Sequence, residues 1–230
     1  MNRRAKTMAE VMAMSFLFLS LSIGTILVIE KAFPEQFGKI TGYTFATINV
    51  TEALPAACNM TVHPEWNLVS FFCIPTIEDI STLTDEFPTY TKIFAYRSQD
   101  SSDPWKAYNP DMPSWVVQDL EYFSRQEGYW IYFDISSSAN FFLYDSKRIP
   151  TRTDLTAGWN LVGYPTNEST DRDSALISIN DSYNSIYSFN NTNKSYSNYT
   201  KGVGGDLNVT MPYQGYWINM SSEDMWVVDW

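Results

Sequence analysis

The sequence predicts a mainly β protein, a β-rich α+β fold, in which one N-terminal transmembrane helix precedes two tandem homologous small β modules. Two observations predict this class. An uncharged stretch of 19 residues, 11–29, lies near the start of the chain. The motifs Trp-Asn-Leu-Val (66–69 and 159–162) and Gly-Tyr-Trp-Ile (128–131 and 215–218) each occur twice, in the same order. Ordered repetition of motifs indicates a duplicated structural unit.

The stretch 11–29 has the length of a membrane-spanning helix. At 1.5 Å per residue it extends roughly 28 Å, close to the thickness of a bilayer's hydrocarbon layer. Basic residues precede it and acidic residues predominate after it, which predicts a cytoplasmic N-terminus and an extracellular remainder. A cleaved secretory signal is the alternative, but the apolar run exceeds the usual 7–15 residues of such signals. We expect a single-pass protein of the cell membrane, with lipid around 11–29, a transmembrane segment at 1–31 and a membrane-proximal segment at 32–63.

The N-terminus also resembles the signal of type IV prepilins. Cleavage after Ala5 would make Lys6 the first residue of the mature chain and Glu10 the fifth. The resemblance implies that the Glu10 carboxylate pairs with the amino terminus of an identical subunit, because an unpaired charge in an apolar bundle is unfavourable. Lys6 departs from the usual first residue, and Pro34 ends the helix soon after the membrane. A simple anchor and a pilin-like subunit of an extracellular filament both stay open.

Composition and rare residues exclude several kinds of chemistry. The net charge of −11 repels phosphate backbones, so we expect no nucleic-acid partner. The single histidine, His63, argues against histidine-based metal sites and against a base-activated nucleophile. We therefore expect no metal, no cofactor and no enzymatic activity. Cys58 and Cys73 would lie in an oxidising compartment, where we expect them to form a disulfide.

Nine Asn-x-Ser/Thr sequons predict N-linked glycans on an extracellular surface. Turn-forming residues produce such triplets too, but nine is an excess, and none lies on the predicted cytoplasmic side. The nine asparagines are Asn49, Asn59, Asn167, Asn180, Asn190, Asn193, Asn198, Asn208 and Asn219.

Three further pairs of segments follow the repeated motifs in the same order. They are 92–99 with 185–192, 104–108 with 195–199, and 141–145 with 225–229. We therefore predict two β modules, at 64–149 and 150–230. Short runs of strand-forming residues bounded by Gly, Pro and Asn predict strands. Helical spacing predicts one short helix in each module, at 77–87 and 171–180, and a further helical turn is an option at 114–123.

Four tryptophans occupy equivalent positions in the repeated motifs. They are Trp66, Trp130, Trp159 and Trp217. Our interpretation is that all four belong to the core, where such rings bury about 150–250 Å² each. The alternative is an aromatic platform that stacks on sugar rings, for which exposed Trp105 and Tyr108 are candidates. Gly128 and Gly215 fit a turn with positive φ or a close approach of backbones.

The tandem Trp-Asn-Leu-Val, Pro and Gly-Tyr-Trp-Ile units resemble a module of archaeal-type cell-surface proteins, also found in some bacteria. The resemblance covers 64–230. The first copy departs from it at Glu65, which replaces a leading glycine, and by an insertion at 71–74. The resemblance implies location and architecture.

The function predicted from these features is that of a membrane-anchored extracellular glycoprotein with a structural, adhesive or envelope-assembly role. Its partners would be identical subunits or other envelope proteins. The alternatives are the filament subunit and a carbohydrate-binding surface module.

Overall fold

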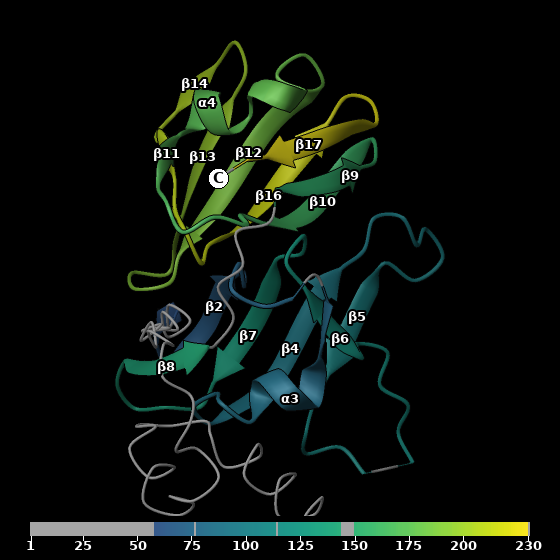
Figure 1. Ribbon diagram of the computed structural model, residues 1–230, viewed down its shortest axis with the longest axis vertical. Coiled ribbons are helices and arrows are strands. Elements are labelled where there is room, and N and C mark those ends of the chain that lie inside the picture. Colours follow the sequence, from purple (N-terminus) through teal and green to yellow (C-terminus); the bar gives the residue numbers. More distant parts are fainter. Residues whose placement is uncertain (1–57, 76, 114, 144–149, 230) are drawn as a thin grey trace, which may run out of the picture. The chain divides into compact units, whose positions relative to one another are not determined.

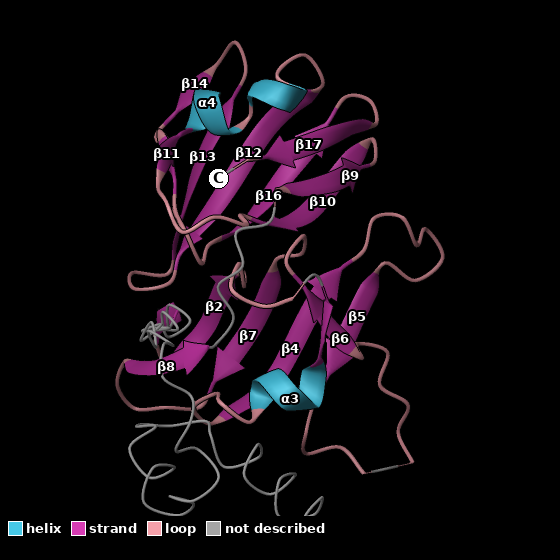
Figure 2. Cartoon of the chain, viewed as in Figure 1, coloured by secondary structure: helices cyan, strands magenta, loops and turns pink. Residues whose placement is uncertain are grey.

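The computed structural model describes residues 58–75, 77–113, 115–143 and 150–229, which are mainly β, as predicted (Figure 2). Within these ranges, no helix combines the length and the apolar character needed to cross a bilayer. The predicted transmembrane stretch 11–29, the possible processing residues Ala5, Lys6 and Glu10, and the sequon at Asn49 lie outside the described residues.

The first half, residues 58–143, forms a four-stranded antiparallel sheet and two short strand pairs. Its elements are β1 (Cys58–Val62), β2 (Glu65–Val69), β3 (Ile77–Asp79), α3 (Ile80–Thr84), β4 (Tyr90–Tyr96), β5 (Trp105–Tyr108), β6 (Tyr122–Ser124), β7 (Tyr129–Phe133) and β8 (Ala139–Leu143). The sheet has the order β2-β7-β4-β5, and the pairs are β1-β8 and β3-β6.

The second half, residues 151–228, repeats this arrangement and adds one strand. Its elements are β9 (Thr151–Leu155), β10 (Gly158–Gly163), β11 (Thr170–Asp171), α4 (Arg172–Ala175), η1 (Ile177–Ile179), β12 (Tyr183–Asn190), β13 (Ser195–Thr200), β14 (Gly204–Gly205), β15 (Val209–Thr210), β16 (Gly215–Met220) and β17 (Asp224–Val228). The sheet has the order β10-β16-β12-β13-β14, and the pairs are β9-β17 and β11-β15 (Figure 1). Every pairing of the first half thus has a counterpart.

Side-chain alternation gives each sheet a core face and an outer face. On β4, Ile93 and Ala95 are buried in the core, while Phe94 and Tyr96 point to the opposite face. Residues 92–96 thus follow the two-residue period of a pleated strand. The central strand of the second half follows the same rule, with Ile186 in its core. The two halves therefore have separate cores and outer faces of the same construction.

The two halves meet where Trp-Asn-Leu-Val of one lies against Gly-Tyr-Trp-Ile of the other. Leu68 and Leu161, from equivalent positions, are buried together with Phe189. Two equivalent backbone hydrogen bonds join the halves. Ser70 N–H donates to the Tyr213 carbonyl at 2.8 Å, and Gly163 N–H donates to the Gln126 carbonyl at 2.9 Å. We call this contact the junction.

Gly128 and Gly215 permit the close approach at the junction. A Cβ on Gly128 would lie 2.7 Å from the carbonyl oxygen of Val162, and one on Gly215 would lie 2.9 Å from Cδ1 of Leu68. Neither glycine is among those with positive φ. Of the two roles predicted for these glycines, close approach is therefore the one that applies.

The helical segments are shorter than predicted, and residues 115–123 form no helix, with a single turn closed by the hydrogen bond from Val116 N–H to the Pro113 carbonyl at 2.8 Å. Asp79 and Asp171 cap α3 and α4 by accepting hydrogen bonds from backbone N–H groups two and three residues later. The segment before β6 instead follows the edge of β5. Leu120 N–H donates to the Ala107 carbonyl at 3.2 Å, and Ala107 N–H donates to the Asp119 carboxylate at 2.7 Å. Satisfying this strand edge favours an extended segment over a helix.

Cys58 and Cys73 form the predicted disulfide. It links β1 to the loop that follows β2, where Phe72, Cys73 and Ile74 are buried. β1 lies within the segment 32–63 and pairs with β8, so the disulfide joins that strand pair to the main sheet. A loop of this length corresponds to about 3 kcal/mol of stabilisation in the chain-entropy model.

Gly128→Ala and Gly215→Ala should each lower the free energy of unfolding by about 1–3 kcal/mol, since the added methyl group overpacks the junction. Chemical denaturation of the purified protein measures this. For Gly215, adding Leu68→Ala removes the closest clashing side chain, so the two effects should be non-additive. Additive effects, or two alanine variants as stable as the wild type, would contradict the proposed role of the glycines.

Candidate functional site

Two buried asparagines set the start of the strands that carry Trp66 and Trp159. The Asn67 amide donates to the carbonyls of His63 (2.7 Å) and Glu65 (2.8 Å) and accepts from His63 N–H (2.9 Å). The Asn160 amide likewise donates to the carbonyls of Thr156 (2.8 Å) and Gly158 (3.1 Å) and accepts from Thr156 N–H (3.0 Å). Because both amides are buried, these bonds fix the turn and hence the direction in which each tryptophan leaves it.

The tyrosines of Gly-Tyr-Trp-Ile fix the strands that carry Trp130 and Trp217. The Tyr129 hydroxyl oxygen accepts from Ser124 N–H at 2.6 Å, and that of Tyr216 accepts from Met211 N–H at 2.7 Å. Each bond reaches the residue five positions earlier. Burial raises the pKa of both phenols, that of Tyr129 well above its ordinary value, so both stay protonated.

Aromatic side chains from both halves line an open pocket of about 390 Å³, which we call the Trp66 pocket. Its lining residues are Trp66, Phe94, Trp130, Phe189 and Tyr196. The first three belong to the first half and the last two to the second. The Trp130 and Phe189 rings meet across the junction with centroids 4.9 Å apart, and within the first half the centroids of Trp66 and Phe94 are 5.8 Å apart.

A second open pocket, of about 500 Å³, lies on the outer face of the second sheet, and we call it the Trp159 pocket. Its lining residues are Tyr96, Trp159, Tyr187, Tyr196 and Trp217. Tyr96 comes from the first half and lies 5.2 Å from Trp217, centroid to centroid. Tyr196 lines both pockets, so the two form one continuous aromatic surface.

Strand register relates the aromatic residues of this surface in pairs. The equivalent pairs are Trp66 and Trp159, Trp130 and Trp217, Phe94 and Tyr187, Tyr96 and Phe189, and Trp105 and Tyr196. The first half contributes three rings to the Trp66 pocket and one to the Trp159 pocket, and the second half contributes two and four. The two pockets are thus two versions of one site, brought together by the junction.

The interpretation of the four motif tryptophans as core residues is wrong. Trp159 is 44% exposed, and Trp66, Trp130 and Trp217 are half-buried on the outer faces of their sheets. Their strand neighbours on the opposite face are the ones that enter the cores. In each motif strand, large side chains alternate between the two faces of the sheet. The sequence does not indicate which of the two faces is buried in the core.

The candidates for ligand stacking, Trp105 and Tyr108, do not act together. Trp105 is 47% exposed and joins the aromatic surface, with its ring 5.1 Å from Tyr96 and 5.9 Å from Trp217. Tyr108 packs against the core of the first half. Sequence reasoning missed Tyr187 and Tyr196. A signal was available in the repeated segments 92–99 and 185–192. Tyr187 is equivalent to Phe94, and Tyr196 lies opposite Phe189 in the neighbouring strand.

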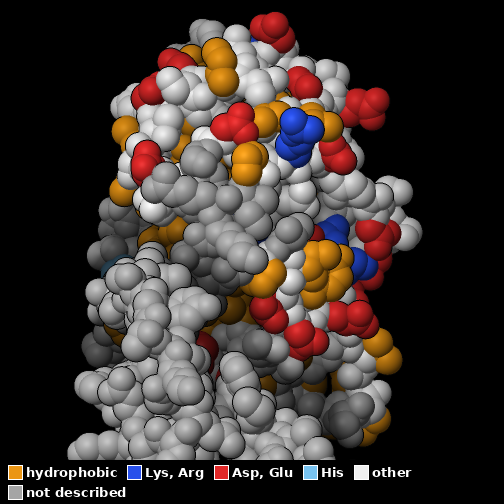
Figure 3. Space-filling model, viewed as in Figure 1, with side chains coloured by type: hydrophobic (Ala, Val, Ile, Leu, Met, Phe, Trp, Pro, Cys, Tyr) orange, Lys and Arg blue, Asp and Glu red, His pale blue; other side chains and the backbone are white. Residues whose placement is uncertain are grey.

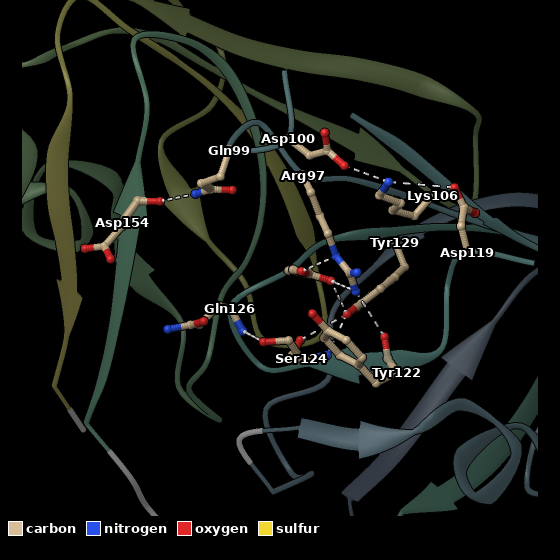
Figure 4. A network of polar contacts seen from close by, with 11 residues as sticks. Arg97, Gln99, Asp100, Lys106, Asp119, Tyr122, Ser124, Gln126, Tyr129 and Asp154 are labelled. Atoms are coloured by element: carbon tan, nitrogen blue, oxygen red, sulfur yellow. Dashed lines mark hydrogen bonds and ion pairs between the residues drawn. The ribbon is translucent and has the colours of Figure 1, made fainter. Parts of the chain in front are cut away.

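A polar network beside the junction surrounds Arg97, the residue that follows Tyr96 in the chain (Figure 4). Arg97 donates to the Glu127 carboxylate at 2.9 Å and lies over the Tyr122 ring, 4.2 Å from its centroid. Glu127 also accepts from the Tyr129 hydroxyl at 2.8 Å. Arg97 and Glu127 therefore tie the end of β4 to the turn before Gly128. Figure 4 also shows Gln99 reaching the Asp154 backbone carbonyl of the second half, at 2.7 Å.

The described residues around the pockets are mainly aromatic and polar side chains, and they form no cluster of the residue types that bind metals. Among the described residues, no group of three or more His, Cys, Asp and Glu side chains is placed to hold a metal ion. His63 contacts the hydroxyls of Ser138 (2.8 Å) and Thr192 (3.1 Å), and partial burial and Lys194 lower its pKa. Acidic side chains are spread over both halves of the face in Figure 3, and basic ones occupy few places on it.

The eight described sequon asparagines all reach the surface, in two kinds of setting. Asn59, Asn198 and Asn219 lie within paired strands. The others lie in loops and turns, or at the end of a strand: Asn167, Asn180, Asn190, Asn193 and Asn208.

Comparisons with protein families, curated proteins and solved structures gave no match to this chain. The aromatic surface is therefore interpreted from its own geometry. Its aromatic rings, the uncharged linings of the two pockets and its openness to solvent fit a binding surface for a ligand with flat, weakly polar faces.

Glu65 has φ of 67°, in the left-handed region, where its counterpart is Gly158 with φ of 92°. Glu65→Gly should therefore raise the free energy of unfolding by about 0.5–1 kcal/mol, while Gly158→Glu should lower it by at least as much. Thermal and denaturant unfolding of the two variants measure this matched pair. Equal effects of the same sign would show that the turn before the tryptophan does not require this conformation.

Proposed function

We propose that this protein is a non-enzymatic, membrane-anchored cell-surface glycoprotein with an adhesive or structural role in the envelope, and that its aromatic pockets bind sugar rings. The exposed aromatic surface carries this proposal. Sugar rings present C–H groups on their faces, and these pack against the electron-rich faces of aromatic rings. Their hydroxyl groups remain at the edge, where amides and hydroxyls accept and donate hydrogen bonds.

Several features favour a saccharide over other ligands. Both pockets are lined by rings and lack a lining charge, which disfavours a strongly ionic ligand. The acidic chain disfavours nucleic acid. Exposed aromatic patches of this kind are uncommon on proteins without a binding role.

We further propose that the two halves are copies of one module. The matching strand orders, the equivalent register shifts near Tyr90 and Tyr183, and the equivalent asparagine and tyrosine hydrogen bonds support duplication. Duplication explains why the two pockets use the same residue types. The disulfide and the nine sequons support an extracellular location. The filament-subunit alternative rests on residues 5–10, which lie outside the described residues, and it stays a prediction from sequence.

Trp66→Ala should weaken binding to the preferred saccharide by about thirtyfold, because truncating a central aromatic contact costs roughly 2 kcal/mol or more. A glycan array of neutral and acidic oligosaccharides identifies the saccharide, and titration calorimetry gives the affinity. The matched control is Trp115→Ala, since Trp115 is 81% exposed and lines neither pocket. A wild-type protein that binds no saccharide, or equal losses in both variants, would contradict the proposed binding surface.

A further inference from the structure

Two sequon asparagines face the Trp159 pocket. Asn198 lies directly opposite Tyr187 in the β12–β13 pair, and Asn219 lies directly opposite Trp159 in the β10–β16 pair. Residues directly opposite in antiparallel strands have Cβ atoms about 4.5–5.5 Å apart on the same face. Each asparagine also follows a pocket ring, Tyr196 or Trp217, by two residues, which places both on one face of the strand. A group attached to either amide would start beside the pocket rings.

Both amide nitrogens are available for attachment. The Asn219 Oδ1 atom accepts a hydrogen bond from Asn184 at 3.0 Å, which orients the amide and leaves its Nδ2 atom free of acceptors among the described residues. The Asn198 side chain makes no hydrogen bond within the same part of the chain, although its backbone N–H donates to Asp206. Both side chains are half-buried against their neighbours. In contrast, Asn190 and Asn193 use their side-chain oxygens to hold a turn.

The equivalent positions in the first half carry no sequon. Ala107 lies opposite Phe94 where Asn198 lies opposite Tyr187, and Tyr132 lies opposite Trp66 where Asn219 lies opposite Trp159. The two versions of the site therefore differ in the groups that border them. Asn59 is the third described sequon asparagine that lies within a paired strand. It too lies opposite an aromatic residue, Phe142, which is 46% exposed.

We propose that Asn198 and Asn219 carry N-linked glycans whose first sugars pack on the rings of the Trp159 pocket, so that this pocket is occupied by the chain's own glycans while the Trp66 pocket stays open. The inference rests on the proposed cell-surface function, because attachment requires an extracytoplasmic glycosylating compartment. It also deepens that function. One pocket stabilises the protein through its own sugars, and the other is left for saccharide from outside the chain.

The attachment chemistry needs one co-reactant, an oligosaccharide linked to a lipid phosphate. The Nδ2 atom of the asparagine forms a bond to C1 of the first sugar while the bond from C1 to the phosphate oxygen breaks. The lipid phosphate leaves with that electron pair, and the amide nitrogen loses one proton. Thr200 and Ser221 supply the sequon hydroxyls.

Mass spectrometry of glycopeptides from the native protein should show glycans at Asn198 and Asn219. Hydroxyl-radical footprinting should then oxidise Trp159 several-fold more slowly in this protein than in the Asn198→Gln/Asn219→Gln variant, with Trp66 unchanged. Thr200→Ala/Ser221→Ala removes the same sequons without altering the asparagines, and it should give the same result. Asn167→Gln/Asn208→Gln, which removes two sequons outside the pockets, should leave the oxidation of Trp159 as in the wild type.

The proposal is overturned if Asn198 and Asn219 are unmodified while Asn167 or Asn208 carries glycan. It is also overturned if both are modified and Trp159 is oxidised as fast as in the variants. These outcomes leave the proposed function standing, since saccharide binding at the Trp66 pocket is measured separately. If no sequon of the native protein is modified, both this proposal and the proposed glycoprotein fail.

Discussion

The close approach of the two sheets at Gly128 and Gly215 is the constraint on which the rest of the structure depends. Each glycine leaves room for the leucine or valine of the partner half's Trp-Asn-Leu-Val strand. The same approach buries Leu68 against Leu161. Because the sheets meet at this point, their outer aromatic faces continue into each other, and rings of one half complete the pocket of the other.

The repeated motifs are therefore explained position by position. The asparagine clamps a turn, the leucine fills the junction, and the valine enters the core. In the second motif the glycine gives room, the tyrosine holds a backbone N–H group, and the isoleucine enters the core. The tryptophans do not enter the cores of the two halves, although Trp130 and Trp217 pack against the junction cluster of Leu68, Leu161 and Phe189. Their position on an exposed face is what connects this scaffold to a proposed binding function.

Much of the fold was predictable from the sequence. The repeat, the mainly β class, the alternation on β4 and the disulfide all follow from local patterns and rare residues. The site was less predictable, because alternation identifies two faces and cannot assign either to the core. Trp105 became a neighbour of Trp217 through the junction, which joins strands far apart in the chain. The extended segment before β6 also depended on tertiary context, since its partner is the edge of β5.

The two halves differ in their disulfide, their insertion and their sequons, although they share one strand arrangement. The first half carries the disulfide and the buried insertion, in which the Phe72 ring packs against Tyr213 with the two centroids 4.8 Å apart. The second half carries most of the sequons. The two halves share the junction but differ in the residues around their pockets. Such a duplicated scaffold can present two related pockets with different occupants.

Native-state hydrogen exchange at the amides of Ser70 and Gly163 tests the junction most directly. Both amides donate across it. If the junction unites the halves, these amides exchange only with global unfolding and show the same protection as the central-strand amides of Ile131 and Ile218. Fast exchange of Ser70 and Gly163 while Ile131 and Ile218 stay protected would show that the halves separate in solution, and that the shared aromatic surface does not persist.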